Sequence, residues 1–109
     1  MKKLILLGVT LGFTAAMTVA AADAKENWEK LCTKCHGADG KGQTKMGEKL
    51  GVRDLSSPKV QDEIKDDVAF KSIKEGMKDK EGKTLMKPFS DLSDDEIKAL
   101  VQYVRGLKQ

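Results

Sequence analysis

The sequence predicts an all-α domain of about four short helices. Apolar residues recur at helical spacing in several segments, helix-starting residues precede three of them, and no convincing alternating strand appears. The chain has 109 residues, which sets one domain as the upper limit. It holds two cysteines and one histidine, so every site that needs more of either residue is excluded.

The first helix is predicted over residues 24–35. Its buried face is expected to consist of five residues at helical spacing: Ala24, Trp28, Leu31, Cys32 and Cys35. The helix should end at Gly37, which opens a glycine-rich loop over residues 37–42. Residues 38–56 carry little periodicity, so no helix is predicted in that stretch.

Two helices are predicted in the middle of the chain. Ser57 is the expected cap and Pro58 the first helical residue of a helix that runs to about Lys65. The next helix should begin at Asp66 or Asp67 and end at Gly76. Its apolar face is expected to carry Phe70, Ile73 and Met77.

The last helix is predicted to follow a loop over residues 77–90. Ser93 and Glu96 form a capping box, and the acidic residues between and beside them suit the positive end of the helix dipole. Lys108 suits the other end. The apolar stripe of this helix is expected to contain Ile97, Leu100, Val101 and Val104.

Residues 1–22 are expected to be a secretory signal peptide, and residues 23–109 the functional domain. Lys2 and Lys3 precede an apolar run from Leu4, and three alanines that suit cleavage end at Ala22. A cut after Ala24 is an alternative, and an uncleaved membrane anchor is the competing interpretation. Removing 22 of the 109 residues leaves 87, with 18 basic and 17 acidic side chains. This near-neutral balance argues against nucleic-acid binding.

The spacing of Cys32, Cys35 and His36 is the C-x-x-C-H motif of covalent haem c attachment. Two cysteines three residues apart on a helix direct their sulfurs to one side, where each can form a thioether with a haem vinyl group. The following histidine then reaches the iron from a fixed side. Structural zinc, iron–sulfur, Rieske and blue-copper sites need ligands that this chain lacks. A thioredoxin-like dithiol or a plain disulfide is the alternative interpretation.

The second axial ligand of the iron must be a residue other than histidine. Three methionines follow residue 22, and Met86 is the first choice because it lies in a loop stiffened by Pro88. Met77 is the second choice, although core packing is its expected role, and Met46 lies near the motif. Ligation by His36 and Met86 would close the iron to exchangeable ligands and raise its reduction potential.

The domain resembles a small monohaem class I cytochrome c over nearly its whole length. The resemblance rests on Cys32 to Gly37, on Ile73 to Gly76, on Met86 to Phe89 and on Leu92 to Arg105. It implies that the first and last helices cross, with Trp28 against Tyr103. Where the family often has Gly-Pro-x-Leu, this chain has Gly47 to Leu50, and the carbonyl of Glu48 is expected to accept a hydrogen bond from the ligand histidine. Lys87 separates Met86 from the proline that often follows the ligand directly.

We therefore expect a monomeric periplasmic electron carrier with one haem c, no enzymatic activity and no membrane insertion after cleavage. Two alternatives remain: an open-site haem protein that binds a gas or peroxide, and a haem subunit of a dedicated oxidoreductase complex. A thiol–disulfide oxidoreductase without haem is a further one.

Charge is distributed unevenly along the chain. Residues 25–53 carry seven basic and four acidic side chains, and residues 71–87 carry six and three. These stretches should flank the haem and form a mildly positive face that docks an acidic redox partner. An ordinary mixed surface is the simpler interpretation. Arg53, Gln43 and Lys45 are candidate partners of the haem propionates.

Overall fold

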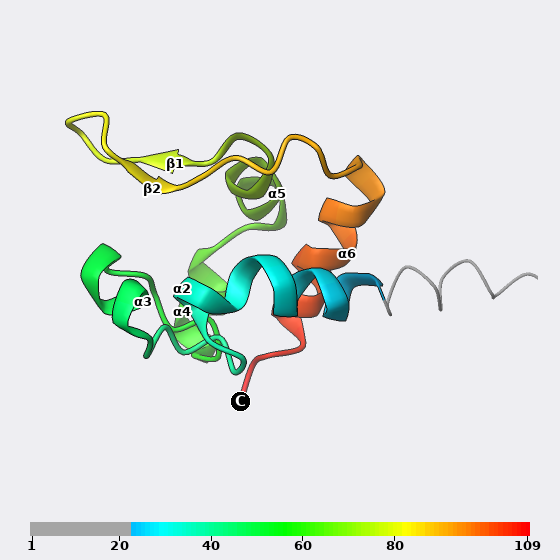
Figure 1. Ribbon diagram of the computed structural model, residues 1–109. Helices are drawn as coiled ribbons and strands as arrows, with labels where there is room; N and C mark the ends of the chain where they lie inside the picture. The colour runs from blue at the N-terminus through cyan, green and yellow to red at the C-terminus, as the bar shows by residue number, and fades with distance from the viewer. Residues whose placement is uncertain (1–22) are drawn as a thin grey trace, which may run out of the picture.

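A computed structural model describes residues 23–109, and the predicted signal peptide lies outside the described residues. Figure 1 shows a layered arrangement in which the first helix lies across the last helix, α6, while a small hairpin extends above the first helix. The chain therefore brings its two ends together and leaves the middle segments to surround them.

The first helix confirms the predicted segment but contains a change of helix type. Residues 23–27 are α-helical, Trp28–Cys32 form a π-helical turn, η1, and Thr33–His36 form α2. The backbone N–H of Thr33 bonds to the carbonyl of Trp28, five residues back, which is the π-helical pattern. The predicted end is also found, because Gly37 adopts φ 81° and donates its N–H to the carbonyl of Thr33.

A short helix that the sequence does not predict follows this one. Helix α3 spans Lys45–Leu50, begins at Thr44, whose hydroxyl accepts a hydrogen bond from the Gly47 N–H, and ends at Gly51 in the left-handed conformation. Six residues are too few to show a helical apolar stripe, so only the two end residues mark it in the sequence.

The two predicted middle helices are present. Helix α4 spans Pro58–Glu63, and the Ser57 hydroxyl accepts from the Val60 N–H as expected for a cap. Helix α5 spans Asp66–Glu75 and ends at Gly76, whose φ of 78° stops the helix. Met77 does not continue the apolar face of α5, because it lies in the next element.

The predicted loop over residues 77–90 contains a two-stranded antiparallel hairpin. Strand β1 is Met77–Lys78, strand β2 is Thr84–Met86, and Met77 pairs with Met86. The Asp79 carboxylate closes the turn by accepting from the N–H groups of Glu81 and Lys83. Strands of two and three residues are too short to show an alternating pattern, which is why the sequence does not reveal them.

Helix α6 spans Asp94–Arg105 and carries the predicted capping box. The Ser93 backbone and side chain hydrogen-bond to Glu96, and these bonds lower the pKa of the Glu96 carboxyl. The basic residue in the last turn is Arg105, so Lys108 lies beyond the helix rather than at its end. The buried apolar residues of the core come mainly from the first and last helices: Ala24, Trp28, Phe89, Ile97, Leu100 and Val101.

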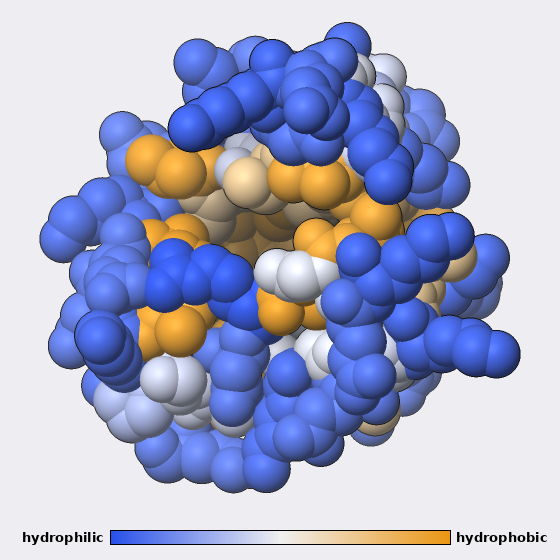
Figure 2. Space-filling view, turned by 90° about the vertical axis from the view of Figure 1, so that its left-hand side faces the viewer, coloured by the Kyte–Doolittle hydropathy of each residue, from blue (hydrophilic) through white to orange (hydrophobic). Residues whose placement is uncertain are grey.

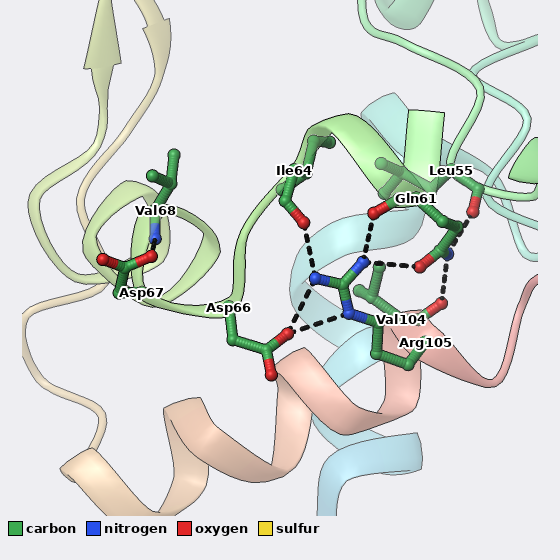
Figure 3. A network of polar contacts seen from close by, with 8 residues as sticks. All are labelled: Leu55, Gln61, Ile64, Asp66, Asp67, Val68, Val104 and Arg105. Atoms are coloured by element: carbon green, nitrogen blue, oxygen red, sulfur yellow. Dashed lines mark hydrogen bonds and ion pairs between the residues drawn. The ribbon is translucent and has the colours of Figure 1, made fainter. Parts of the chain in front are cut away.

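A polar network fastens the end of α6 to α4 and α5 (Figure 3). The buried Gln61 donates its amide N–H groups to the carbonyls of Leu55 and Val104. Arg105 donates to the Gln61 backbone and side-chain oxygens at 2.7 and 2.9 Å, and its guanidinium also pairs with Asp66. Because each polar group has a partner, α6 is fixed in place without leaving buried donors unpaired.

Candidate functional site

The three motif residues lie on the last turns of the first helix. Cys32 ends η1, while Cys35 and His36 belong to α2, just before the glycine that ends it. All three side chains are partly buried, and the two thiols are not joined to each other. Both sulfurs are therefore available for bonds to another group.

The His36 ring is held by an aromatic stack. Trp28 lies against it with ring centroids 5.6 Å apart and an interplanar angle of 28°, and on its other contact Trp28 meets Tyr103 at 5.6 Å. Trp28 is only 2% exposed and donates its indole N–H to the carbonyl of Ala38 at 3.3 Å. The imidazole is thus positioned by the same contact that joins the first and last helices, as the sequence predicts for Trp28 and Tyr103.

Burial keeps the His36 imidazole neutral. It lowers the pKa of His36, so the ring holds a free lone pair at neutral pH, as a metal ligand requires. The Nδ1 atom is buried and has no hydrogen-bond partner. The predicted bond from this ring to the Glu48 carbonyl is therefore not formed, because the loop approaches α2 through a different pair of groups.

The approach of α3 to the motif depends on Thr44 and Gly47. The Thr44 hydroxyl donates to the carbonyl of Cys35 at 2.8 Å and accepts from the Gly47 N–H at 2.8 Å. A Cβ atom on Gly47 would lie 2.3 Å from the Cys35 carbonyl and 2.6 Å from that of Gly42, so no larger residue fits. The sequence analysis missed both residues. The available signal was a threonine in helix-capping position ahead of an otherwise featureless stretch.

The protonation of the cysteines argues against thiol–disulfide exchange. Burial, followed by the nearby Cys35, raises the pKa of Cys32 to about 11. Redox-active dithiols rely on a lowered pKa because the thiolate is the nucleophile. Cys32 is a protonated thiol at neutral pH, which suits a stable covalent attachment better than rapid exchange.

Met86 ends β2, and close backbone packing fixes its position. A Cβ atom on Gly76 would lie 2.6 Å from the Met86 carbonyl and 2.9 Å from the Pro88 nitrogen. Just beyond, the Phe89 N–H donates to the Ile73 carbonyl at 2.9 Å. Met86 is half-buried, so its thioether is held beside the body of the domain rather than at the tip of the hairpin.

The other two methionines lie in different surroundings. Met46 lies in α3 and lines a recess together with Lys34, Lys45 and Lys49. Met77 is 47% exposed, so the expectation that it packs in the core is wrong. It belongs to the hairpin edge, where the helical face of α5 has already ended.

The candidate partners of the haem propionates have other roles or none assigned. Arg53 pairs with Glu63 across the loop before α4. Gln43 and Lys45 are exposed, and neither side chain has a hydrogen-bond partner among residues 23–109. The structure therefore does not bring these three residues together.

A hollow in one face of the molecule is large and apolar enough to draw attention (Figure 2). On this face the hairpin lies at the top and α3 below, hydrophobic side chains line the interior, and hydrophilic side chains surround the mouth. Two unjoined thiols, a neutral imidazole with an unpaired nitrogen and a fixed thioether form a donor set suited to an iron porphyrin. An apolar hollow suits the macrocycle, so these residues fit haem c.

Comparisons with known proteins agree with this chemistry. Residues 19–104 match the protein family described as cytochrome c oxidase, cbb3-type, subunit III. The fold is similar to that of a c-type cytochrome, KustC0563, with a TM-score of 0.69 and 36% identity, covering 80% of this chain and 99% of that chain. A mutant of that cytochrome gives 0.67 and 37%, covering 79% and 99%. No curated protein sequence matches the chain.

Substituting Gly76 by alanine should damage the support of Met86. Gly76→Ala and Gly82→Ala both place a side chain at positive φ, 78° and 84°, which costs about 1–2 kcal/mol. Only Gly76→Ala also forces a Cβ against the backbone of residues 86–88, which adds about 1–3 kcal/mol.

Urea unfolding of the two variants and the parent measures this difference. Gly82→Ala is the matched control, because nothing lies within 4 Å of its added Cβ. Equal losses of unfolding free energy in the two variants would show that the close approach at Gly76 has no energetic weight.

Proposed function

Because this chain belongs to the cytochrome c family described as cytochrome c oxidase, cbb3-type, subunit III, we propose that it is an exported single-electron carrier with His36 and Met86 as axial ligands. The predicted all-α class I cytochrome c fold is confirmed by its helical elements and its likeness to a c-type cytochrome. Members of this family carry covalently attached haem c, and the chain is a haem-based electron-transfer protein.

The observation that carries the proposal is the state of His36, which directly follows Cys35 and is held neutral by burial against Trp28. In this assignment Cys32 and Cys35 form the two thioethers, His36 supplies one axial nitrogen, and Met86 supplies sulfur from the opposite side. Haem c, when bound, supplies a one-electron couple between ferric and ferrous iron. The chain itself provides a rigid and apolar enclosure.

Rigid ligands favour electron transfer over ligand-exchange chemistry. The Trp28–Tyr103 stack restrains the His36 ring, and the close packing at Gly76 restrains the segment that carries Met86. A site whose groups need not move when charge changes has little to reorganise. This supports an electron carrier over the gas-binding or peroxide-reactive alternative, which needs an open position on the iron.

A ring of lysines supports docking of an acidic partner. Figure 2 shows hydrophilic side chains around the mouth of the hollow, and the stretches on either side of it carry exposed lysines that form no ion pair within the described residues. These lysines are Lys34, Lys45, Lys49, Lys78, Lys80, Lys83 and Lys87. Unpaired cations around the cofactor attract acidic surfaces and orient them before contact.

The family description supports a second candidate function. It names an oxidase subunit, so a haem subunit of a dedicated oxidoreductase complex fits the same fold and the same site residues. Co-purification with a stoichiometric partner distinguishes this candidate from a monomeric carrier that diffuses freely.

Export with cleavage after Ala22 is part of the proposal. Between residues 23 and 109 no helix has the length and apolar character needed to cross a membrane. The purified periplasmic fraction should therefore contain a chain that begins at Asp23 and carries one haem through two thioethers. Mass spectrometry under denaturing conditions measures both at once. A retained N-terminal segment would indicate a membrane anchor, and dissociation of the haem would contradict covalent attachment.

Removing the thioether at residue 86 should change the iron site. In Met86→Ala the ferric protein should show a shifted and weakened near-infrared sulfur-to-iron band and a lower reduction potential, because the original thioether is lost. Met46→Ala is the matched control and should leave both unchanged. If the Met86→Ala band and potential equal those of the parent, the assignment of Met86 fails.

Electron transfer to an acidic partner should slow as salt is added. Between about 20 and about 200 mM salt, the bimolecular rate should fall roughly tenfold, because screening removes long-range attraction. Stopped-flow kinetics measures the rate. Lys49→Glu should lower the rate at low salt, whereas Lys98→Glu, on α6 away from the hollow, should have little effect. A rate that does not depend on salt would exclude steering by these lysines.

A further inference from the structure

Two methionines lie directly opposite each other in the hairpin. Met77 in β1 and Met86 in β2 are paired residues of the antiparallel ladder. Side chains of directly opposite residues project from the same side of a two-stranded sheet, with Cβ atoms about 5 Å apart. The structure therefore places a second thioether next to the one assigned to the iron.

Met77 has no packing role that accounts for it. It is 47% exposed and is one of three large hydrophobic residues that are exposed between residues 23 and 109. An unbranched thioether side chain has three rotatable bonds and adapts to irregular surroundings. Met77 is therefore free to change its position without disturbing the core.

We propose that Met77 is a reserve axial ligand, whose thioether binds the iron when Met86 is displaced or removed. This inference rests on the proposed ligation by His36 and Met86. A thioether is a neutral donor, so the exchange replaces one iron–sulfur bond by another and releases no proton. The iron thereby keeps six ligands and stays closed to external molecules.

The hairpin can make the required movement. Met77 must move by about the spacing between two strands, about 4.8 Å. The ladder contains only two and three residues, and its register is irregular between Met77 and Lys78. Isolated two-stranded hairpins are marginally stable, so a shift disrupts little structure. Gly76, with φ 78°, directly precedes Met77 and provides a flexible link to α5.

The other potential donors are less suitable. Met46 is fixed in α3 by the contacts of Thr44 and Gly47 with Cys35, and it lines a separate recess among lysines. The lysines of the hairpin are ammonium groups, which have no lone pair until they lose a proton. At neutral pH the nearest donor that needs no proton loss is therefore Met77.

The test uses the haem-loaded protein with ¹³C-labelled methionine methyl groups. In the reduced state the ring current of haem moves the methyl signal of a ligating methionine far upfield. In the parent this signal should belong to Met86, and Met77→Leu should leave it unchanged. In Met86→Ala one upfield methyl should remain and should belong to Met77. Alanine is chosen at residue 86 because it leaves room for the incoming side chain.

The double variant Met77→Leu/Met86→Ala should lose the upfield methyl signal, whereas Met46→Leu/Met86→Ala should keep it. Carbon monoxide should bind Met86→Ala about tenfold more weakly than the double variant, since ligation by Met77 leaves only the open fraction competent. If Met86→Ala shows no upfield methyl and binds carbon monoxide like the double variant, the reserve ligand is excluded while Met86 keeps its assignment. If the parent signal does not belong to Met86, the ligation in the proposed function and this inference both fail.

Discussion

The contact of Trp28 with both His36 and Tyr103 is the interaction on which the rest of the structure depends. One buried indole joins the first helix to the last and, on another side, restrains the imidazole that follows the second cysteine. In a chain with few aromatic residues, a single side chain thus contributes to the core and orients the axial ligand. Stability of the domain and geometry of the iron site are therefore coupled through one residue.

Two glycines control how closely other segments approach this centre. Gly47 lets α3 reach the carbonyl of Cys35, and Gly76 lets the segment after β2 pass the end of α5. Both contacts are between backbone groups, so they fix position without depending on side-chain rotamers. The lysine-bearing segments α3 and the hairpin are held on either side of the hollow by these contacts, which connects backbone packing to the surface proposed for docking.

Much of the fold could be predicted, because α4, α5 and α6 begin at clear caps and the first helix has a regular apolar face. The motif residues were predicted from spacing alone, since attachment chemistry imposes it. Helix α3 and the hairpin could not be predicted because their segments are too short for periodicity. The hydrogen bond expected from His36 to Glu48 was wrong because Thr44 and Gly47 set the approach of the loop. Such an approach depends on tertiary packing that no local pattern records.

The π-helical turn gives a task to a residue between the two cysteines. With the Thr33 N–H bonded five residues back, the carbonyl four residues back, that of Glu29, accepts instead from the Thr33 hydroxyl at 2.8 Å. Attachment chemistry leaves the two intervening positions open to any amino acid. Here one of them helps to maintain the widened helical turn that leads from the indole to the first sulfur, so the freedom of choice at that position is smaller than the attachment reaction alone requires.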